Sequence, residues 1–103
     1  MYYPAFNYEK NSTIHFYLYI INLIPKKDSL FETVLISAND TLVEMFLNNL
    51  IKFHDIYKIL LKILNSKEFT KYKTIRAKNI EQILKLNKIV RLKTQSLSVL
   101  SSF

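Results

Sequence analysis

The stretch that decides the fold is TLVEMFLNNLIKFHDIYKILLKIL, residues 41–64. Its apolar side chains recur at steps of three and four residues, the strongest periodic pattern in the chain; they are Leu42, Met45, Phe46, Leu50, Phe53, Ile56, Tyr57, Leu60, Leu61 and Leu64. Glu44 stands three residues after Thr41, the spacing of a capping box at a helix start. The pattern predicts one long amphipathic helix over residues 40–65.

The residues before this helix favour a β-hairpin over 12–37. Residues 14–24 form the longest apolar run, but eleven helical residues rise only about 16 Å, half of the roughly 30 Å of a membrane core. Their β-branched and aromatic side chains are typical of a well-covered strand. Pro25 to Ser29 then forms a turn, and residues 30–37 supply the second strand. A membrane span is therefore not expected.

The residues after the long helix form a basic segment over 66–95. Residues 69–76 fit either a strand or a further helical turn, and the β-branched Thr70, Thr74 and Ile75 favour the strand. Asn79 can cap a short helix, and residues 89–94 fit a last strand. The prediction is one α+β domain over 1–103, in which two helices cover one face of a sheet, with an N-terminal arm at 1–11 and a tail at 96–103.

Composition excludes several kinds of chemistry. The chain has no glycine, which phosphate-binding and dinucleotide-binding loops require, and no cysteine for thiol catalysis, disulfides or thiolate metal sites. His15 and His54 are the two histidines, and structural roles fit them better than catalysis or metal binding. We therefore expect no catalytic residue, no metal, no cofactor and no small-molecule substrate, and hence a non-enzymatic protein.

Charge is divided unevenly along the chain. Residues 1–50 hold three lysines and five acidic residues, whereas residues 51–103 hold ten lysines, two arginines and three acidic residues. A strongly basic half is typical of a protein that binds a polyanion, most often nucleic acid. The predicted RNA-binding residues are Lys67, Lys71, Lys73, Arg76, Lys78, Lys85, Lys88, Arg91 and Lys93. The alternative is a solvated basic face with Phe69 and Tyr72 in the core.

Both ends of the chain are rich in apolar side chains that one small core is not expected to bury. The predicted protein-interface residues are Tyr2, Tyr3, Phe6, Tyr8, Leu97, Leu100 and Phe103. Together with the basic half they indicate a structural subunit of a larger assembly that contacts RNA and neighbouring protein subunits. The alternative function is a small viral or phage-like effector that acts by binding a protein.

Two stretches carry a family resemblance. Phe31-Glu-Thr-Val-Leu-Ile-Ser37 and Leu84-Lys-Leu-Asn-Lys-Ile-Val-Arg-Leu92 resemble the first strand and the closing helix and strand of the sixth protein of the bacterial and organellar small ribosomal subunit. The resemblance implies a ferredoxin-like fold, ribosomal RNA and a neighbouring small-subunit protein as partners. It also implies that Asn87 and Arg91 lie near that contact.

Residue types with A/T-rich codons make up about half of the chain, a bias typical of organellar, viral and endosymbiont genomes. The N-terminus lacks a basic region followed by an apolar run and a cleavage site, so no targeting segment is expected there. An organellar ribosomal protein would then be made in the mitochondrial or other organellar matrix. An effector would instead act in the cytoplasm of an infected host cell.

Overall fold

Helices make up all the regular structure in the described part of the chain. The computed structural model describes residues 15, 16 and 18–101, with side chains placed up to residue 98. Its labelled helices are α2 (Phe31–Leu47), α3 (Phe53–Asn65), α4 (Lys67–Thr70), the 3-10 helix η1 (Lys71–Thr74) and α5 (Ile80–Ser101). Residues 18–23 are helical as well. The predicted α+β fold with a sheet is therefore wrong, and so is the ferredoxin-like fold that the resemblance implied.

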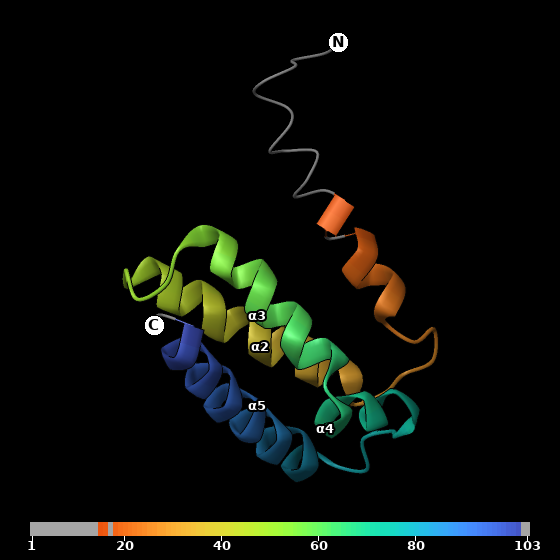
Figure 1. The fold of residues 1–103 in the computed structure, drawn as a ribbon. Helices are drawn as coiled ribbons and strands as arrows, with labels where there is room; N and C mark the ends of the chain where they lie inside the picture. The colour runs from red at the N-terminus through yellow and green to blue at the C-terminus, as the bar shows by residue number, and fades with distance from the viewer. Residues whose placement is uncertain (1–14, 17, 102–103) are drawn as a thin grey trace.

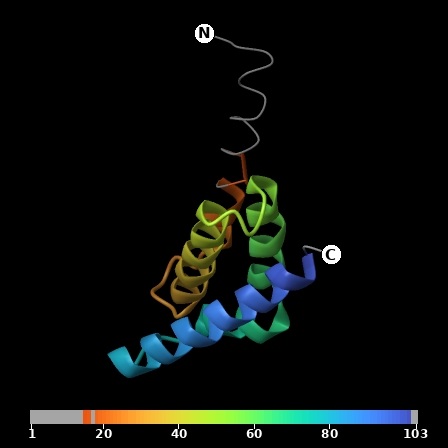
Figure 2. The ribbon, with the colours of Figure 1, turned by 90° about the vertical axis from the view of Figure 1, so that its left-hand side faces the viewer.

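The helices pack around one core. α2 and α3 run side by side in opposite directions (Figure 1), and α5 crosses them (Figure 2). α2 packs against both α3 and α5, while α4 and η1 connect the end of α3 to the segment that leads into α5. The buried apolar side chains come from every labelled helix except η1 and from three positions outside those helices, Ile20, Leu30 and Ile51. The others are Phe31, Val34, Ala38, Leu42, Ile56, Ile59, Leu60, Ile63, Leu64, Phe69, Leu86 and Val90.

Helix replaces both strands of the hairpin predicted over 12–37, at the described residues 15, 16 and 18–23 and from Phe31 onward, whereas residues 24–30 between them are not helical. Phe31, Val34, Ala38 and Leu42 are all fully buried, at steps of three and four residues that only a helix brings to one side. α2 begins at Phe31, whose N–H donates a hydrogen bond to the Ser29 hydroxyl at 3.3 Å. Strand propensity is a weak preference, and the chance to bury this stripe outweighs it.

The predicted single helix over 40–65 is two helices. Asn49 has φ 61°, a left-handed conformation that asparagine tolerates better than most residues, and it ends α2. α3 then begins after Lys52, whose N–H donates to the Asp55 carboxylate at 2.9 Å, and ends at Asn65. The capping box proposed for Thr41 is also wrong. Thr41 lies inside α2, and its hydroxyl donates to the Ser37 carbonyl at 2.7 Å.

The basic segment contains no strand among its described residues. Residues 67–74 form α4 and η1, so the alternative of a further helical turn was the right one. The strand predicted over 89–94 lies inside α5, where Val90 and Thr94 are fully buried and the Thr94 hydroxyl donates to the Val90 carbonyl at 2.7 Å. Asn79 does cap this helix, because its side-chain oxygen accepts a hydrogen bond from the Gln82 N–H at 2.9 Å.

None of the helices among the described residues has both the length and the apolar character needed to cross a membrane.

Candidate functional site

Titratable side chains that could perform chemistry are scattered. Within residues 15, 16 and 18–101 the structure brings together no group of three or more His, Asp or Glu side chains that could hold a metal ion. His54 lies 3.6 Å from the carboxylate of its sequence neighbour Asp55, and its side chain is 58% exposed. His15 is exposed near the start of the described residues. The two described histidines therefore belong to no common site.

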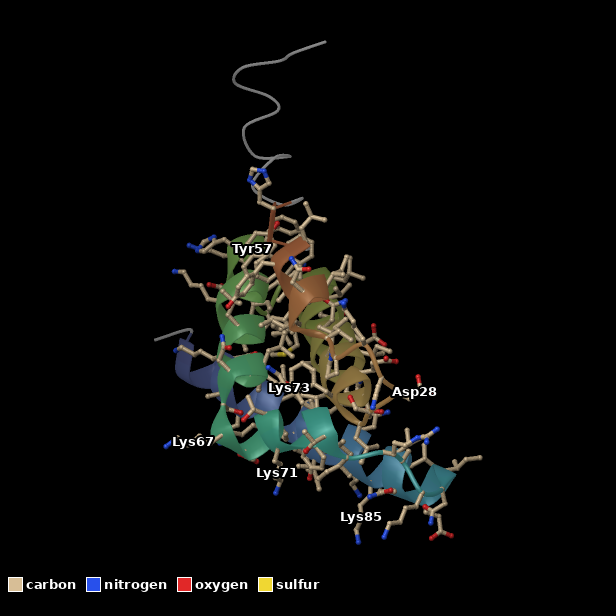
Figure 3. All side chains as sticks on the ribbon, turned by 90° about the vertical axis from the view of Figure 1, so that its right-hand side faces the viewer. Asp28, Tyr57, Lys67, Lys71, Lys73 and Lys85 are labelled. Carbon is tan, nitrogen blue, oxygen red and sulfur yellow. The ribbon has the colours of Figure 1, made fainter. Side chains whose placement is uncertain are left out.

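The nine predicted RNA-binding residues do not form one face. Figure 3 shows Lys67, Lys71 and Lys85 pointing outward on the side formed by α4, η1 and the start of α5. Arg91 and Lys93 are two residues apart on α5 and therefore point in different directions. Arg91 pairs with Glu44 of α2 at 2.9 Å, and Lys93 with Glu68 of α4 at 3.7 Å. The remaining members of the set, Lys73, Arg76, Lys78 and Lys88, are exposed or half-buried.

Asn87 and Arg91, singled out by the ribosomal resemblance, both belong to α5, and Arg91 contacts α2. The Arg91 guanidinium contributes a surface ion pair that joins the two helices. The side-chain oxygen of Asn87 is buried without a hydrogen-bond partner, and Asn39 of α2 is in the same situation. Buried polar atoms normally have partners, so both oxygens mark places where further polar contacts would be favourable.

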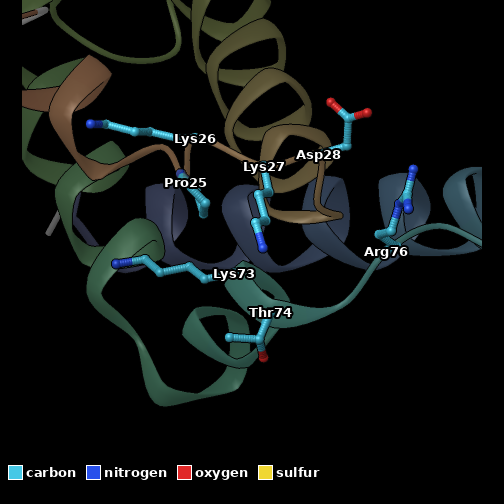
Figure 4. A pocket seen from close by; sticks show the side chains of 7 residues that line it. All are labelled: Pro25, Lys26, Lys27, Asp28, Lys73, Thr74 and Arg76. Carbon is cyan, nitrogen blue, oxygen red and sulfur yellow. The ribbon is translucent and has the colours of Figure 1, made fainter.

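A groove lined by cationic side chains lies between the turn before α2 and the end of η1 with the residues that follow it (Figure 4). Its volume is about 720 Å³, and its lining residues are Pro25, Lys26, Lys27, Asp28, Lys73, Thr74 and Arg76. Sequence reasoning included Lys73 and Arg76 in the basic set but assigned Lys26 and Lys27 only to a turn. The one available signal was their position beside Pro25, directly before an amphipathic segment.

A second surface feature is apolar. Ile36, Val43 and Leu47 lie on one side of α2, at steps of seven and four residues, and Leu50 and Phe53 lie in the turn to α3 and at its start. We call these five residues the α2 patch. These side chains are 58%, 37%, 70%, 61% and 51% exposed. The Phe53 ring packs edge-on against Phe46 and Tyr57, at centroid distances of 5.5 and 5.4 Å, so the patch is anchored to the core.

The predicted protein-interface residues fall mostly outside the described part. Tyr2, Tyr3, Phe6, Tyr8 and Phe103 are not described, and the side chain of Leu100 is not placed. Leu97 is half-buried and packs against the core. The α2 patch was not predicted, because Leu50 and Phe53 were assigned to the buried stripe of a single continuous helix.

Comparison with known proteins gives a consistent family. The model of the DXP reductoisomerase C-terminal domain matches residues 5–93. The 1-deoxy-D-xylulose 5-phosphate reductoisomerase of Pelagibacter ubique is 49% identical over 94 residues, which are 90% of this chain and 24% of that protein. The enzyme of the same name from Proteus mirabilis is 37% identical over 65 residues, 63% of this chain and 15% of that protein. No solved structure matches.

These matches correct several predictions. The ribosomal resemblance was wrong, because the matched domain is part of a reductoisomerase. For the same reason both predicted functions were wrong, the structural subunit that contacts RNA and the viral or phage-like effector. The prediction of a non-enzymatic protein was wrong as well. The predicted RNA-binding residues are exposed or half-buried, but RNA is no longer their expected partner. The chain spans about a quarter of the length of the Pelagibacter enzyme. It belongs to the family of DXP reductoisomerase C-terminal domains.

Proposed function

We propose that this chain serves as the C-terminal helical domain of a 1-deoxy-D-xylulose 5-phosphate reductoisomerase and contributes by packing against the rest of that enzyme. The family and the 49% identity to the Pelagibacter enzyme support the assignment. The observation that carries the packing role is the α2 patch, where five large apolar side chains are between 37% and 70% exposed. Exposed apolar patches of this kind usually mark an interface.

The partner of the α2 patch is the part of the polypeptide that precedes a C-terminal domain. About three quarters of the Pelagibacter enzyme lies outside the region matched by this chain. Burying one exposed leucine contributes about 1.5–3 kcal/mol, so covering Leu47 and Leu50 alone would stabilise the contact substantially. This intramolecular contact takes the place of the neighbouring subunits expected from the sequence. The apolar ends, residues 1–8 and 97–103, stay candidates for the same interface.

The reacting groups are supplied by the rest of the enzyme. A reductoisomerase needs a hydride donor such as a nicotinamide dinucleotide, and the usual dinucleotide-binding loop requires glycines. This chain contains no glycine and no cysteine, so its residues do not fit such a loop. The hydride donor would therefore bind outside residues 1–103, which we propose form one domain. An intracellular location follows, because a phosphorylated sugar is charged and is retained inside cells.

A chimera tests this function. The Pelagibacter reductoisomerase would carry the present chain in place of its matching segment, and its reductoisomerase activity and thermal unfolding would be measured. We expect an active enzyme, since nearly half of the matched residues are identical. Leu47→Ser in the chimera should lower its unfolding temperature by a few degrees, as loss of about 1–2 kcal/mol of burial does.

Leu92→Ser is the matched control, because Leu92 is 59% exposed on α5, outside the α2 patch. Leu92→Ser should leave the chimera unchanged, and both substitutions should leave the isolated chain almost unchanged. An inactive chimera whose grafted segment is folded would contradict the assignment. Equal effects of the two substitutions in the chimera would contradict the packing role.

A further inference from the structure

The groove between residues 25–28 and 73–76 has the size of a ligand site. Its volume of about 720 Å³ is within the usual range for sites of small molecules. Four of its seven lining residues are cationic, and Asp28 is the single acidic one. Among these residues there is no large apolar side chain. The groove therefore offers positive charge at its surface without a large apolar side chain in its lining.

The two walls of the groove are held together. The Leu30 N–H donates to the Ile75 carbonyl at 2.8 Å, which ties the turn before α2 to the segment after η1. The Lys73 ammonium lies 5.0 Å from the centre of the Phe31 ring, and Phe31 is fully buried. This cation–π contact anchors the Lys73 side chain to the core. In Figure 4 the Lys27 side chain extends from its turn toward the 73–76 segment.

The cations of the groove have no carboxylate partner within 4.0 Å among the described residues, unlike Arg91 and Lys93. Even Asp28 and Arg76, which share the lining, form no ion pair. Like charges that line a concave surface reinforce one another and concentrate anions there. The groove is thus lined by cationic side chains from two distant segments, and none of these side chains has an ion-pair partner among the described residues.

We propose that this groove binds a small molecule that carries phosphate groups. Arginine and lysine are the side chains that contact phosphate through charge-assisted hydrogen bonds, and Arg76 can provide two such bonds at once. An acidic protein segment is the alternative ligand, since basic clusters also recognise acidic peptides. Bound peptides usually add a strand edge or an anchoring pocket for a large apolar side chain, and the lining residues include neither a strand nor a large apolar side chain. The site is independent of the packing role and of the reductoisomerase assignment, since it consists only of residues of this chain.

The direct test measures binding of inorganic pyrophosphate to the 103-residue chain, by calorimetry and by the shifts of amide NMR signals. It is done at about 0.15 M salt, because charges more than about 8 Å apart are screened at that concentration. We expect saturable binding with the largest shifts in residues 25–28 and 73–76. The double variant Lys27→Gln/Arg76→Gln should weaken binding by at least about tenfold, because it removes two charge-assisted contacts. Asp28→Asn should tighten binding, because it removes the one negative charge of the lining.

The matched control is Lys58→Gln/Lys62→Gln, which removes two charges from exposed positions of α3. It should change the affinity by less than about twofold, because distant charges are screened. Equal weakening by both double variants would overturn the site in favour of a diffuse effect of net charge. Hexaglutamate binding as tightly as pyrophosphate would overturn the phosphate assignment in favour of an acidic protein segment. Absence of saturable binding would overturn the proposal altogether.

Discussion

At the scale of single residues, burial separates two phenylalanines of similar sequence context. Phe31 is fully buried at the start of α2, whereas Phe53 is 51% exposed at the start of α3. Helical periodicity assigned Phe53 to the buried stripe, and the predicted strand gave Phe31 no special weight. The difference comes from the packing of whole helices, which periodicity within one segment does not contain.

Replacing these two residues by alanine in the isolated chain tests this contrast. Phe31→Ala should lower the free energy of unfolding by about 3–5 kcal/mol, because a buried phenylalanine leaves a cavity. Phe53→Ala should cost about 1–2 kcal/mol, because the exposed half of its ring loses nothing and its edge contacts with Phe46 and Tyr57 are modest. Urea unfolding followed by circular dichroism measures both values. A larger loss at Phe53 than at Phe31 would mean that the helices pack differently.

At the scale of elements, the sequence predicted amphipathic segments but not always their type. Residues 40–47 and 53–65 were predicted to be helical, and the periodic run identified them because polar residues interrupt it regularly. In the apolar run 14–24 almost every residue is hydrophobic, so helix and strand patterns match equally well there. The strand predicted over residues 89–94 was wrong for another reason. β-Branched side chains lower helix propensity only slightly, and burial of Val90 and Thr94 outweighs that cost.

The break between α2 and α3 depends on Asn49, with its φ of 61°. Asn49→Ala should destabilise the chain by about 1 kcal/mol. The short polar side chain of asparagine can hydrogen-bond to the nearby backbone and so makes the left-handed conformation less unfavourable, whereas alanine has no such polar group. Asn49→Gly should be close to neutral or stabilising, because glycine adopts this conformation freely. Asn48→Ala is the control, since Asn48 has φ −93° and an exposed side chain. Thermal unfolding measures all three, and equal losses at the two positions would mean that the turn does not rely on Asn49.

At the scale of the whole molecule, the unequal charge of the two halves suggested a polyanion-binding face. Folding distributes those charges over several surfaces and pairs two of them, Arg91 and Lys93, with acids of other helices. The groove that does gather cations draws Lys26 and Lys27 from the acidic half of the sequence. The distribution of charge along the sequence therefore predicted neither which residues line the cationic groove nor where it lies in the fold, because the groove depends on the contact between two distant segments.

The relation to an enzyme could not be predicted from the chemistry of the residues in this chain. The sequence excludes glycine-rich and thiol-based sites within this chain, and that exclusion was taken to describe a whole protein. A chain that spans about a quarter of its Pelagibacter relative can lack reacting groups and still belong to an enzyme. The surface proposed to contact the rest of the polypeptide is the α2 patch.

Hydroxyl-radical footprinting of the α2 patch tests the central claim most directly, because the oxidation rate of a side chain follows its exposure to solvent. The rates would be compared between the isolated chain and the Pelagibacter chimera, with Leu92 as the internal reference. If the domain packs against the rest of the enzyme through this patch, oxidation of Leu47, Leu50 and Phe53 should fall several-fold in the chimera while that of Leu92 stays the same. Equal oxidation of the three residues in an active chimera and in the isolated chain would contradict the packing role.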